Sequence, residues 1–261
     1  EQLPGSWMVH GTTGYDFSCL LNGIFIDRSA EEAMTAGYQR FVGYAIDFVK
    51  LAHDCRRLII KSAMAGEINV LSDQLHRLAK RSRYTQDYTL NGLREALTEI
   101  VASFPVYRSY CTAKGLTVVD RRHVEQAVDL AKSNFQAEDT SIYDFIRSVL
   151  LLETRQTGDQ QDTELVDFVM KFQQYTGPVM AKGLEDTAFY IYNRLVSLNE
   201  VGDDPCRFGT TVEDFHAANL ARNEQRPLSM LNTGTHDSKR SEDVRARINV
   251  LSEMSSEWLQ A

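Results

Sequence analysis

The chain has 261 residues, of which 43% are hydrophobic and 25% charged, and its formal net charge is -8. This length and apolar content exclude a disordered chain and predict one large domain or two small ones. The acidic balance argues against a nucleic-acid binder, which needs a concentrated cationic face. No segment approaches the length of a membrane span and no secretory signal opens the chain, so we expect a cytoplasmic protein.

The cysteines and histidines do not form a metal-binding pattern. Cys19, Cys55, Cys111 and Cys206 are separated by 36, 56 and 95 residues, without a C-x-x-C pair or a tight cluster of cysteines and histidines that could close a zinc site. We therefore predict reduced, mostly buried cysteines and no metal site.

The first polar motif is "GTTGYDF" at 11–17. Its two glycines permit a tight backbone path, and Thr12, Thr13, Tyr15 and Asp16 offer hydrogen-bonding groups. That set of groups suits a polyhydroxylated ligand, and it suits an ordinary tight turn equally well.

A long helical region follows. Apolar residues recur at helical spacing from Ala30 to Ala65 and predict one long helix, or two helices joined near Gly43. The same period continues in five segments, at 67–83, 90–104, 120–134, 141–151 and 163–175. Strand candidates are short, at 23–27, 105–111 and 227–233.

The segment 177–194, "GPVMAKGLEDTAFYIYNR", is not a phosphate-binding loop, because Lys182 precedes Gly183 and no hydroxyl follows. Adjacent Glu185 and Asp186 diverge on a helix and cannot face each other as an acid and a base. Lys182 with Glu185 could bind sugar hydroxyls, and a surface ion pair is an equal alternative. Three aromatic residues here could stack on sugars or belong to the core: Phe189, Tyr190 and Tyr192.

The last motif lies between a strand expected to end at Asn232 and a helix expected to begin near Ser241. Ser241 would cap that helix, and an inward stripe of Val244, Ile248 and Leu251 would follow. His236 and Asp237 then stand after a strand and before a helix, where barrel enzymes place catalytic side chains. The alternative is that Asp237 only orders the turn.

Four blocks together resemble the maltooligosyl trehalose synthases, in the α-amylase superfamily of barrel glycosidases and transglycosidases. They are "GTTGYDF", "GPVMAKGLEDTAFYIYNRL", "SLNEVGDDPCRFG" and "THDSKRSEDVRARINVLSE", which follow in the family's order. The resemblance implies a mainly α fold, with a helical insertion and a partial (β/α)8 barrel of few short strands. The implied divisions are a barrel segment at 1–29, the insertion at 30–175, and later barrel elements at 176–261.

The implied activity is that of an isomerase. An intramolecular transglucosylation converts the reducing-end α-1,4 linkage of a maltooligosaccharide into an α,α-1,1 linkage, as in trehalose. The maltooligosaccharide is the expected partner, and no metal or organic cofactor is implied.

The same resemblance implies roles for individual residues. The "HD" pair of the superfamily corresponds to His236 and Asp237, so Asp237 would stabilise the transition state and His236 would contact the same sugar. Lys182, Tyr15 and Lys239 are further candidates for substrate contact. Ser238 stands where the family usually has Thr, which keeps the hydroxyl.

The resemblance also implies a missing half. In the family, the nucleophilic aspartate and the general-acid glutamate precede the "GTTGYDF" block, and only ten residues precede it here. We therefore expect an internal fragment that lacks the upstream barrel half of its polypeptide, folds mainly through its helices and is inert alone. The alternatives are a fragment of an α-1,4-glucan hydrolase and a non-catalytic glucan-binding or helical interaction module.

Overall fold

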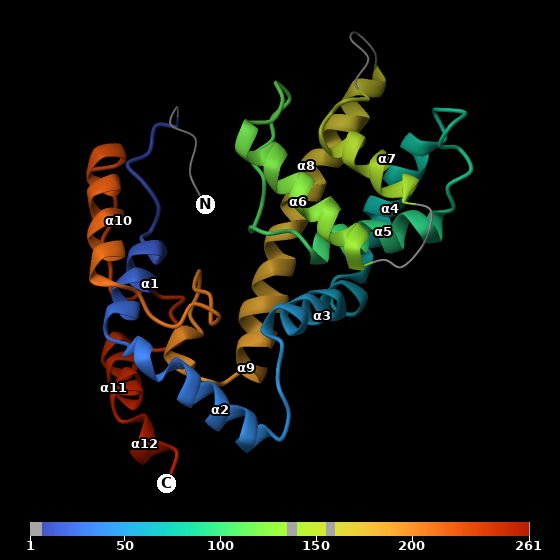
Figure 1. Cartoon of the computed structure of the whole chain (residues 1–261). Coiled ribbons are helices and arrows are strands. Elements are labelled where there is room, and N and C mark those ends of the chain that lie inside the picture. The colour runs from blue at the N-terminus through green and yellow to red at the C-terminus, as the bar shows by residue number, and fades with distance from the viewer. Residues whose placement is uncertain (1–6, 135–139, 155–159, 261) are drawn as a thin grey trace. The chain divides into compact units, whose positions relative to one another are not determined.

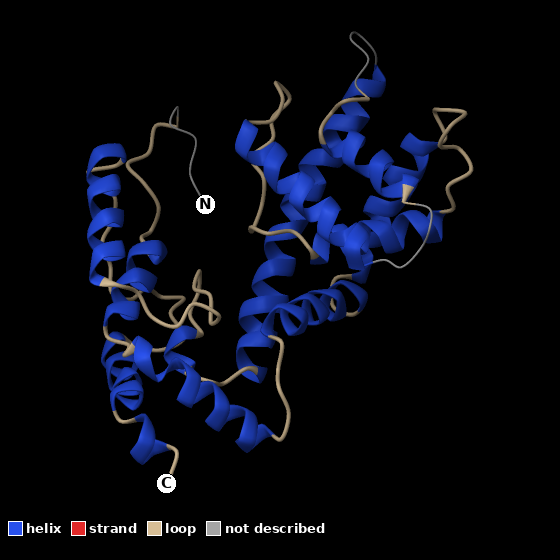
Figure 2. Ribbon diagram, in the orientation of Figure 1, coloured by secondary structure: helices blue, strands red, loops and turns tan. Residues whose placement is uncertain are grey.

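The structure is a computed structural model that describes residues 7–134, 140–154 and 160–260. Helices dominate it, and the only β pairing in these ranges is an isolated bridge between Thr112 and Gly115 (Figures 1 and 2). The prediction of a mainly α fold is therefore confirmed.

The helices follow the chain in this order: α1 (Tyr15–Ile24), α2 (Glu31–Val42), α3 (Phe48–Lys61), α4 (Ala65–Ala79), α5 (Leu90–Ala102), α6 (Val118–Asn134), α7 (Ser141–Leu150), α8 (Gln160–Met180), α9 (Phe189–Ile191), α10 (Val212–Gln225), α11 (Glu242–Glu253) and α12 (Ser255–Trp258). Short 3-10 turns lie at Arg28–Ala30 and Val196–Leu198, and a π-helical segment, η2, joins α8 to α9 at Ala181–Ala188. The helix predicted over 30–65 is two helices, because Gly43 adopts a φ of 90° and ends α2. The five further predicted helices are confirmed as α4 to α8.

The chain forms two compact units. One, here the split unit, combines Glu1–Phe48 with Ala188–Ala261, and the other, the central unit, is Val49–Thr187.

The central unit is built around an apolar core shared by α4 to α8. Leu97 and Ile100 of α5 and Phe168 of α8 are fully buried, and Phe172 packs edge-on against Phe104 with ring centroids 5.6 Å apart. The Thr89 side chain caps α5 by accepting a hydrogen bond from the Gly92 amide. Apolar packing therefore stabilises this unit.

The π-helical segment η2 lies against α3 at a glycine. A Cβ on Gly183 would come within 2.7 Å of the Arg56 Cα, so the two backbones approach as only glycine allows. The Arg56 guanidinium donates hydrogen bonds to the carbonyls of Ala52 and Phe104. Its burial lowers the pKa of Arg56 to about 10.

The split unit has a smaller apolar core and relies on buried polar side chains. Its core consists of Ile26, Ala30, Met34, Leu195, Leu198 and Phe208, with Ile248 and Leu251 of α11 packed against it. Asn22 donates to the Ser197 carbonyl at 2.9 Å, and Asn249 donates to Asn22 Oδ1 at 3.0 Å. Because these amides are buried, each hydrogen bond fixes α1 against a particular neighbour.

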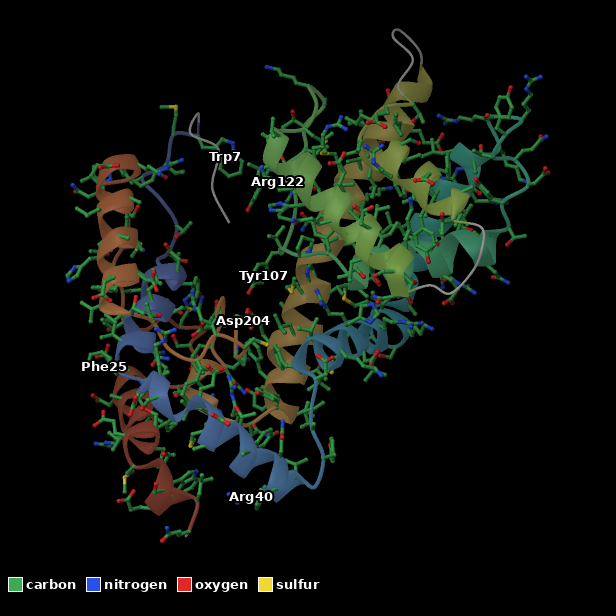
Figure 3. The ribbon with its side chains drawn as sticks, viewed as in Figure 1. Trp7, Phe25, Arg40, Tyr107, Arg122 and Asp204 are labelled. Atoms are coloured by element: carbon green, nitrogen blue, oxygen red, sulfur yellow. The ribbon has the colours of Figure 1, made fainter. Side chains whose placement is uncertain are left out.

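The three predicted strands are wrong. Residues 23–27 contain the end of α1 and a turn, in which the amides of Phe25 and Ile26 bond to the carbonyls of Asn22 and Gly23. The Phe25 side chain is 55% exposed (Figure 3). Residues 105–111 and 227–233 are irregular, since a strand needs a paired neighbour and neither segment has one among the described residues.

Two helices arise where none was expected. Tyr15 to Phe17, interpreted as loop, form the first turn of α1, and α10 has no buried residue and hence no apolar stripe to reveal it. Thr211 caps α10 by accepting from the Asp214 amide at 2.9 Å.

The expectations for α11 are partly wrong. Ser241 occupies the N-cap position but its side chain makes no capping hydrogen bond, and Val244 is 41% exposed. The buried residues of this helix are polar: Arg245, Asn249 and Ser252.

Candidate functional site

The site centres on Asp237, which the fold brings against the start of α1. The Tyr15 hydroxyl donates to Asp237 Oδ2 at 3.1 Å and accepts a hydrogen bond from Thr235 Oγ1 at 3.2 Å. The Asp237 amide also donates to Thr235 Oγ1 at 3.2 Å. Two motifs that lie more than 200 residues apart in the sequence thus meet through one tyrosine hydroxyl.

Gly14 allows α1 to start close to residues 230–232, which precede the loop that carries Asp237. Gly14 adopts a φ of 86°, and a Cβ there would lie 2.5 Å from the Met230 carbonyl oxygen. The Asn232 amide donates to the Thr13 carbonyl beside it. Any other residue at position 14 would meet both backbone strain and a steric clash, so this glycine positions Tyr15.

The loop that carries Asp237 is held by a buried carboxylate. The two oxygens of Glu200 accept hydrogen bonds from the backbone amides of Lys239 and Arg240, each at 2.8 Å. Glu200 is only 5% exposed. The carboxylate therefore fixes the backbone directly after the His236–Asp237 pair.

A buried guanidinium holds the same loop at its two ends. Arg245 of α11 donates to the carbonyl of Thr233 and, at 3.0 Å, to that of Arg240. The Thr235 amide donates to Ser238 Oγ at 2.9 Å within the loop. Together these contacts fix residues 233–240 without regular secondary structure.

The functional groups of the site face solvent. The side chains of His236 and Asp237 are 86% and 59% exposed, and His236 Nε2 lies 3.3 Å from Asp237 Oδ2. Lys239 Nζ lies 5.1 Å from the centroid of the Tyr190 ring, which is itself 62% exposed. A carboxylate, an imidazole and an exposed aromatic ring are groups that bind sugar hydroxyls and the apolar face of a sugar ring.

The other two aromatic residues of the 177–194 motif are structural. Phe189 and Tyr192 are buried and pack against Phe48, with ring centroids 6.2 and 5.1 Å away. Phe189 and Tyr192 therefore belong to the core, which was one of the two alternatives that the sequence left open. Tyr190 alone of the three is exposed.

A buried acid lies behind Tyr15. Asp203 lines a small cavity together with Tyr15, Cys19 and Glu200, and burial raises the pKa of Asp203 to about 6. Its Oδ1 accepts from the Asp204 amide and from Arg207, which lowers the pKa but does not offset the burial. Burial also raises the pKa of the Cys19 thiol, so that thiol stays protonated.

Lys182 belongs to the central unit, whereas Tyr15, His236, Asp237 and Lys239 belong to the split unit. Lys182 pairs with Asp186 at 2.7 Å, and that hydrogen bond raises the pKa of Lys182. Glu185, suggested as its partner for sugar hydroxyls, is buried and accepts a hydrogen bond from the Tyr107 hydroxyl. The ion pair therefore forms with Asp186, and Glu185 is not available to a ligand.

Sequence reasoning missed Glu200, Thr235 and Arg245. Glu200 lies in a block that carries the family resemblance, and Thr235 stands two residues before Asp237, but neither position has a pattern that assigns a role.

In the part of the chain that the structure describes, no group of three or more His, Cys, Asp or Glu residues could hold a metal ion. Cys19, Cys55 and Cys111 are free and buried, while Cys206 is free and exposed. None of the described helices is long and apolar enough to cross a membrane.

No protein-family model matches the chain. Over 99% of its length it is 30% identical to sequences assigned to maltooligosyl trehalose synthase from two strains of Mycobacterium tuberculosis. It also aligns over its whole length with the solved structure of maltooligosyltrehalose synthase from Arthrobacter ramosus, at 32% identity and a TM-score of 0.82. A structure from Sulfolobus tokodaii with the same description gives 30% identity and a TM-score of 0.73. The chain spans about 30% of the length of the Mycobacterium relatives and 31% of the Arthrobacter structure.

Proposed function

Because this chain is homologous to one segment of the maltooligosyl trehalose synthases, we propose that it supplies part of the glucan site of such an enzyme. In this proposal, Asp237 is the carboxylate that stabilises the transition state of an intramolecular transglucosylation. The observation that carries it is the exposed Asp237 carboxylate, which Tyr15 holds on a loop that the buried Glu200 fixes.

The chemistry that Asp237 would assist develops positive charge on the sugar. Cleavage of an α-1,4 linkage passes through an oxocarbenium-like transition state, which a fixed negative charge stabilises. The Tyr15 hydroxyl orients one oxygen of Asp237 through the hydrogen bond at 3.1 Å, and the other oxygen would face the substrate. His236 and Lys239 would donate hydrogen bonds to hydroxyls of the same sugar, and Lys182 would contact the glucan elsewhere.

Two further carboxylates lie beside the Asp237 loop, and both accept hydrogen bonds from other residues of the chain. Glu200 is committed to two backbone amides, and Glu242 accepts a hydrogen bond from Thr233. Retaining glycosidases need a nucleophile and a general acid about 5–5.5 Å apart. We therefore expect the 261-residue chain by itself to catalyse no transglucosylation, and the upstream barrel half to supply both groups.

We also propose that the helices of residues 30–175 are an insertion between barrel segments at 1–29 and 176–261. The path of the chain supports an insertion, since it leaves the split unit at Phe48, forms the central unit and returns at Ala188, although these boundaries at 49 and 187 differ from the expected 30 and 175.

The test uses a full-length synthase that carries this segment, incubated with maltohexaose, beside its Asp237→Asn variant. We expect reducing ends to disappear with the native residue, and the variant to be slower by a factor on the order of 10² or more. A Glu213→Gln variant is the matched control, because Glu213 lies on the exposed α10. An unchanged rate in Asp237→Asn would overturn the role of this residue.

The same assay separates the alternatives. If reducing ends increase, water rather than the sugar's own hydroxyl resolves the intermediate, and the protein is an α-1,4-glucan hydrolase. If maltohexaose binds without turnover in both proteins, the segment is a glucan-binding module.

A further inference from the structure

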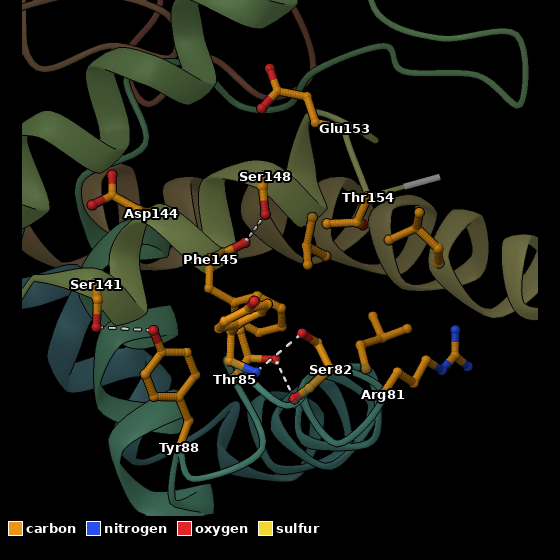
Figure 4. A pocket seen from close by; sticks show the side chains of 14 residues that line it. Arg81, Ser82, Thr85, Tyr88, Ser141, Asp144, Phe145, Ser148, Glu153 and Thr154 are labelled. Atoms are coloured by element: carbon orange, nitrogen blue, oxygen red, sulfur yellow. Dashed lines mark hydrogen bonds between the residues drawn. The ribbon is translucent and has the colours of Figure 1, made fainter. Parts of the chain in front are cut away.

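A cavity of the central unit has no part in the Asp237 site. It measures about 680 Å³ and opens between the end of α4, the loop at 81–88, α7 and α8 (Figure 4). Ligand pockets usually measure about 300–1,000 Å³, so this one could enclose two or three sugar rings.

Hydroxyl groups dominate the lining of this cavity. Half of its residues carry one: Ser82, Tyr84, Thr85, Tyr88, Ser141, Ser148 and Thr154. Thr85 Oγ1 donates to the Ala79 carbonyl at 2.6 Å, and Ser148 Oγ donates to the Phe145 carbonyl at 2.7 Å. A hydroxyl that has donated its hydrogen presents acceptor lone pairs, so these two oxygens suit a ligand rich in O–H donors.

The charged residues of the lining are neutralised by partners. Arg81 pairs with Glu164, Asp144 pairs with Lys132 at 2.5 Å, and Glu153 pairs with two arginines. The arginine contacts lower the pKa of Glu153, so this carboxylate stays ionised and paired. A lining whose charges are already matched favours a neutral ligand over a phosphate or a carboxylate.

Aromatic rings supply the apolar part of the cavity. Tyr88 and Phe145 pack against each other with centroids 5.7 Å apart, and the Tyr88 hydroxyl donates to Ser141 Oγ at 2.9 Å. Tyr84 at the edge is 77% exposed, with the Arg83 guanidinium 4.7 Å from its ring centroid. One exposed and two half-buried rings beside hydroxyls match the two faces of a sugar, whose C–H face is apolar and whose edge is polar.

We propose that this cavity is a second carbohydrate site, which binds a neutral oligosaccharide without chemistry. The occupant is a short α-1,4-glucan, the class of compound that the names of the relatives contain. No residue of the Asp237 site belongs to this cavity, so either proposal can fail without the other.

The test is a titration of the whole chain with maltotriose, followed by backbone amide NMR shifts. We expect shifts at residues 82–88 and 141–149, which saturate, and which can be separated from any shifts at 235–240 that report the Asp237 site. Shifts confined to 235–240, or no shifts at all, would overturn the second site.

Variants and other ligands sharpen the test. Tyr84→Ala should weaken maltotriose binding at the cavity about fivefold, as expected for the loss of one stacking ring. Tyr44→Ala, which removes a tyrosine ring that is 62% exposed from the split unit, should change nothing. Equal shifts with glycerol at the same hydroxyl concentration would contradict a saccharide site, and tighter binding of glucose 6-phosphate than of glucose would contradict the neutral character of the ligand.

Discussion

The two units of this chain differ in the balance of apolar and polar contacts that stabilise them. In the central unit the helices α4 to α8 share one extended apolar core, whereas the apolar core of the split unit is small. Both units bury polar side chains that bond to the backbone, such as Asp120 and Gln173 in the central unit. With its smaller apolar core, the split unit depends relatively more on such contacts, which involve Asn22, Asn199, Glu200, Arg245 and Asn249. Apolar packing is not directional, whereas a hydrogen bond to a particular carbonyl or amide fixes a position, which suits the irregular loop that carries the candidate residues His236, Asp237 and Lys239.

The largest expected effect tests whether the apolar core stabilises the central unit. Phe168→Ala removes a fully buried ring from α8, and we expect a loss of about 3–5 kcal/mol in the free energy of unfolding of the central unit. Urea titration with amide hydrogen exchange at α4 and α5 would measure it. Val70→Ala, at a side chain that is 54% exposed, is the control and should cost far less. A loss below about 1 kcal/mol for Phe168→Ala would refute apolar packing as the source of stability in this unit.

The next prediction tests the hydrogen bonds that the buried Glu200 makes in the split unit. Glu200→Ala leaves the amides of Lys239 and Arg240 without their acceptor. Because both residues are only half-buried, each lost contact should cost about 1–2 kcal/mol, and we expect a loss of about 2–4 kcal/mol in the split unit. The loop should also lose its order, visible as exchange broadening of the Asp237 amide signal. The control is Glu224→Ala, at an exposed position of α10. Retention of a single sharp Asp237 signal in Glu200→Ala would show that the loop does not need this carboxylate.

The helices of the central unit could be predicted from the sequence, whereas those of the split unit were predicted only in part. Residues 67–175 carry apolar side chains at helical spacing, which is the direct imprint of a shared apolar core. Helix α10 buries no residue and so leaves no period to detect, and α11 buries Arg245 and Asn249 where an apolar stripe would have been found. The predicted strands were wrong because alternation favours a strand only where a neighbour is present to pair with it.

The candidate site was predicted in part. His236 and Asp237 stand in a short motif whose position before a helix is visible, and the family resemblance named Tyr15. The supporting residues were not predicted, because Glu200 and Arg245 are single buried polar residues whose partners lie 5 to 40 positions away at no regular spacing. Local patterns carry no information about such pairs, so only the folded arrangement identifies them.

A pH dependence distinguishes the buried acid of the split unit from its exposed neighbour. Burial raises the pKa of Asp203 to about 6 from its ordinary 3.8, so the folded state holds a proton that the unfolded state has lost. Asp203 therefore reduces the free energy of unfolding as pH rises from about 4 through 6, by up to about 3 kcal/mol.

The measurement compares thermal unfolding of the native chain and of Asp203→Asn between pH 4 and 7. The stability of the variant relative to the native chain should rise across this window, because Asn cannot lose a proton. Asp204→Asn is the matched control, since Asp204 is exposed and its Oδ1 accepts from the Cys206 amide, as an Asn oxygen also could. A constant difference between Asp203→Asn and the native chain would show that Asp203 ionises normally in the folded state.

The smallest expected effect concerns Lys182, whose ion pair with Asp186 lies on the surface of the central unit. Exposed pairs of this type contribute little to stability, because solvent screens them and two long side chains must be ordered. Lys182→Met should therefore leave the unfolding curve unchanged, whereas binding of maltohexaose to a full-length synthase should weaken if Lys182 contacts the glucan. Asp186→Asn breaks the same ion pair without removing the ammonium group, so it should leave both stability and glucan binding unchanged. If the two variants weaken binding equally, the ion pair shapes the local helix, and Lys182 is not itself a ligand of the sugar.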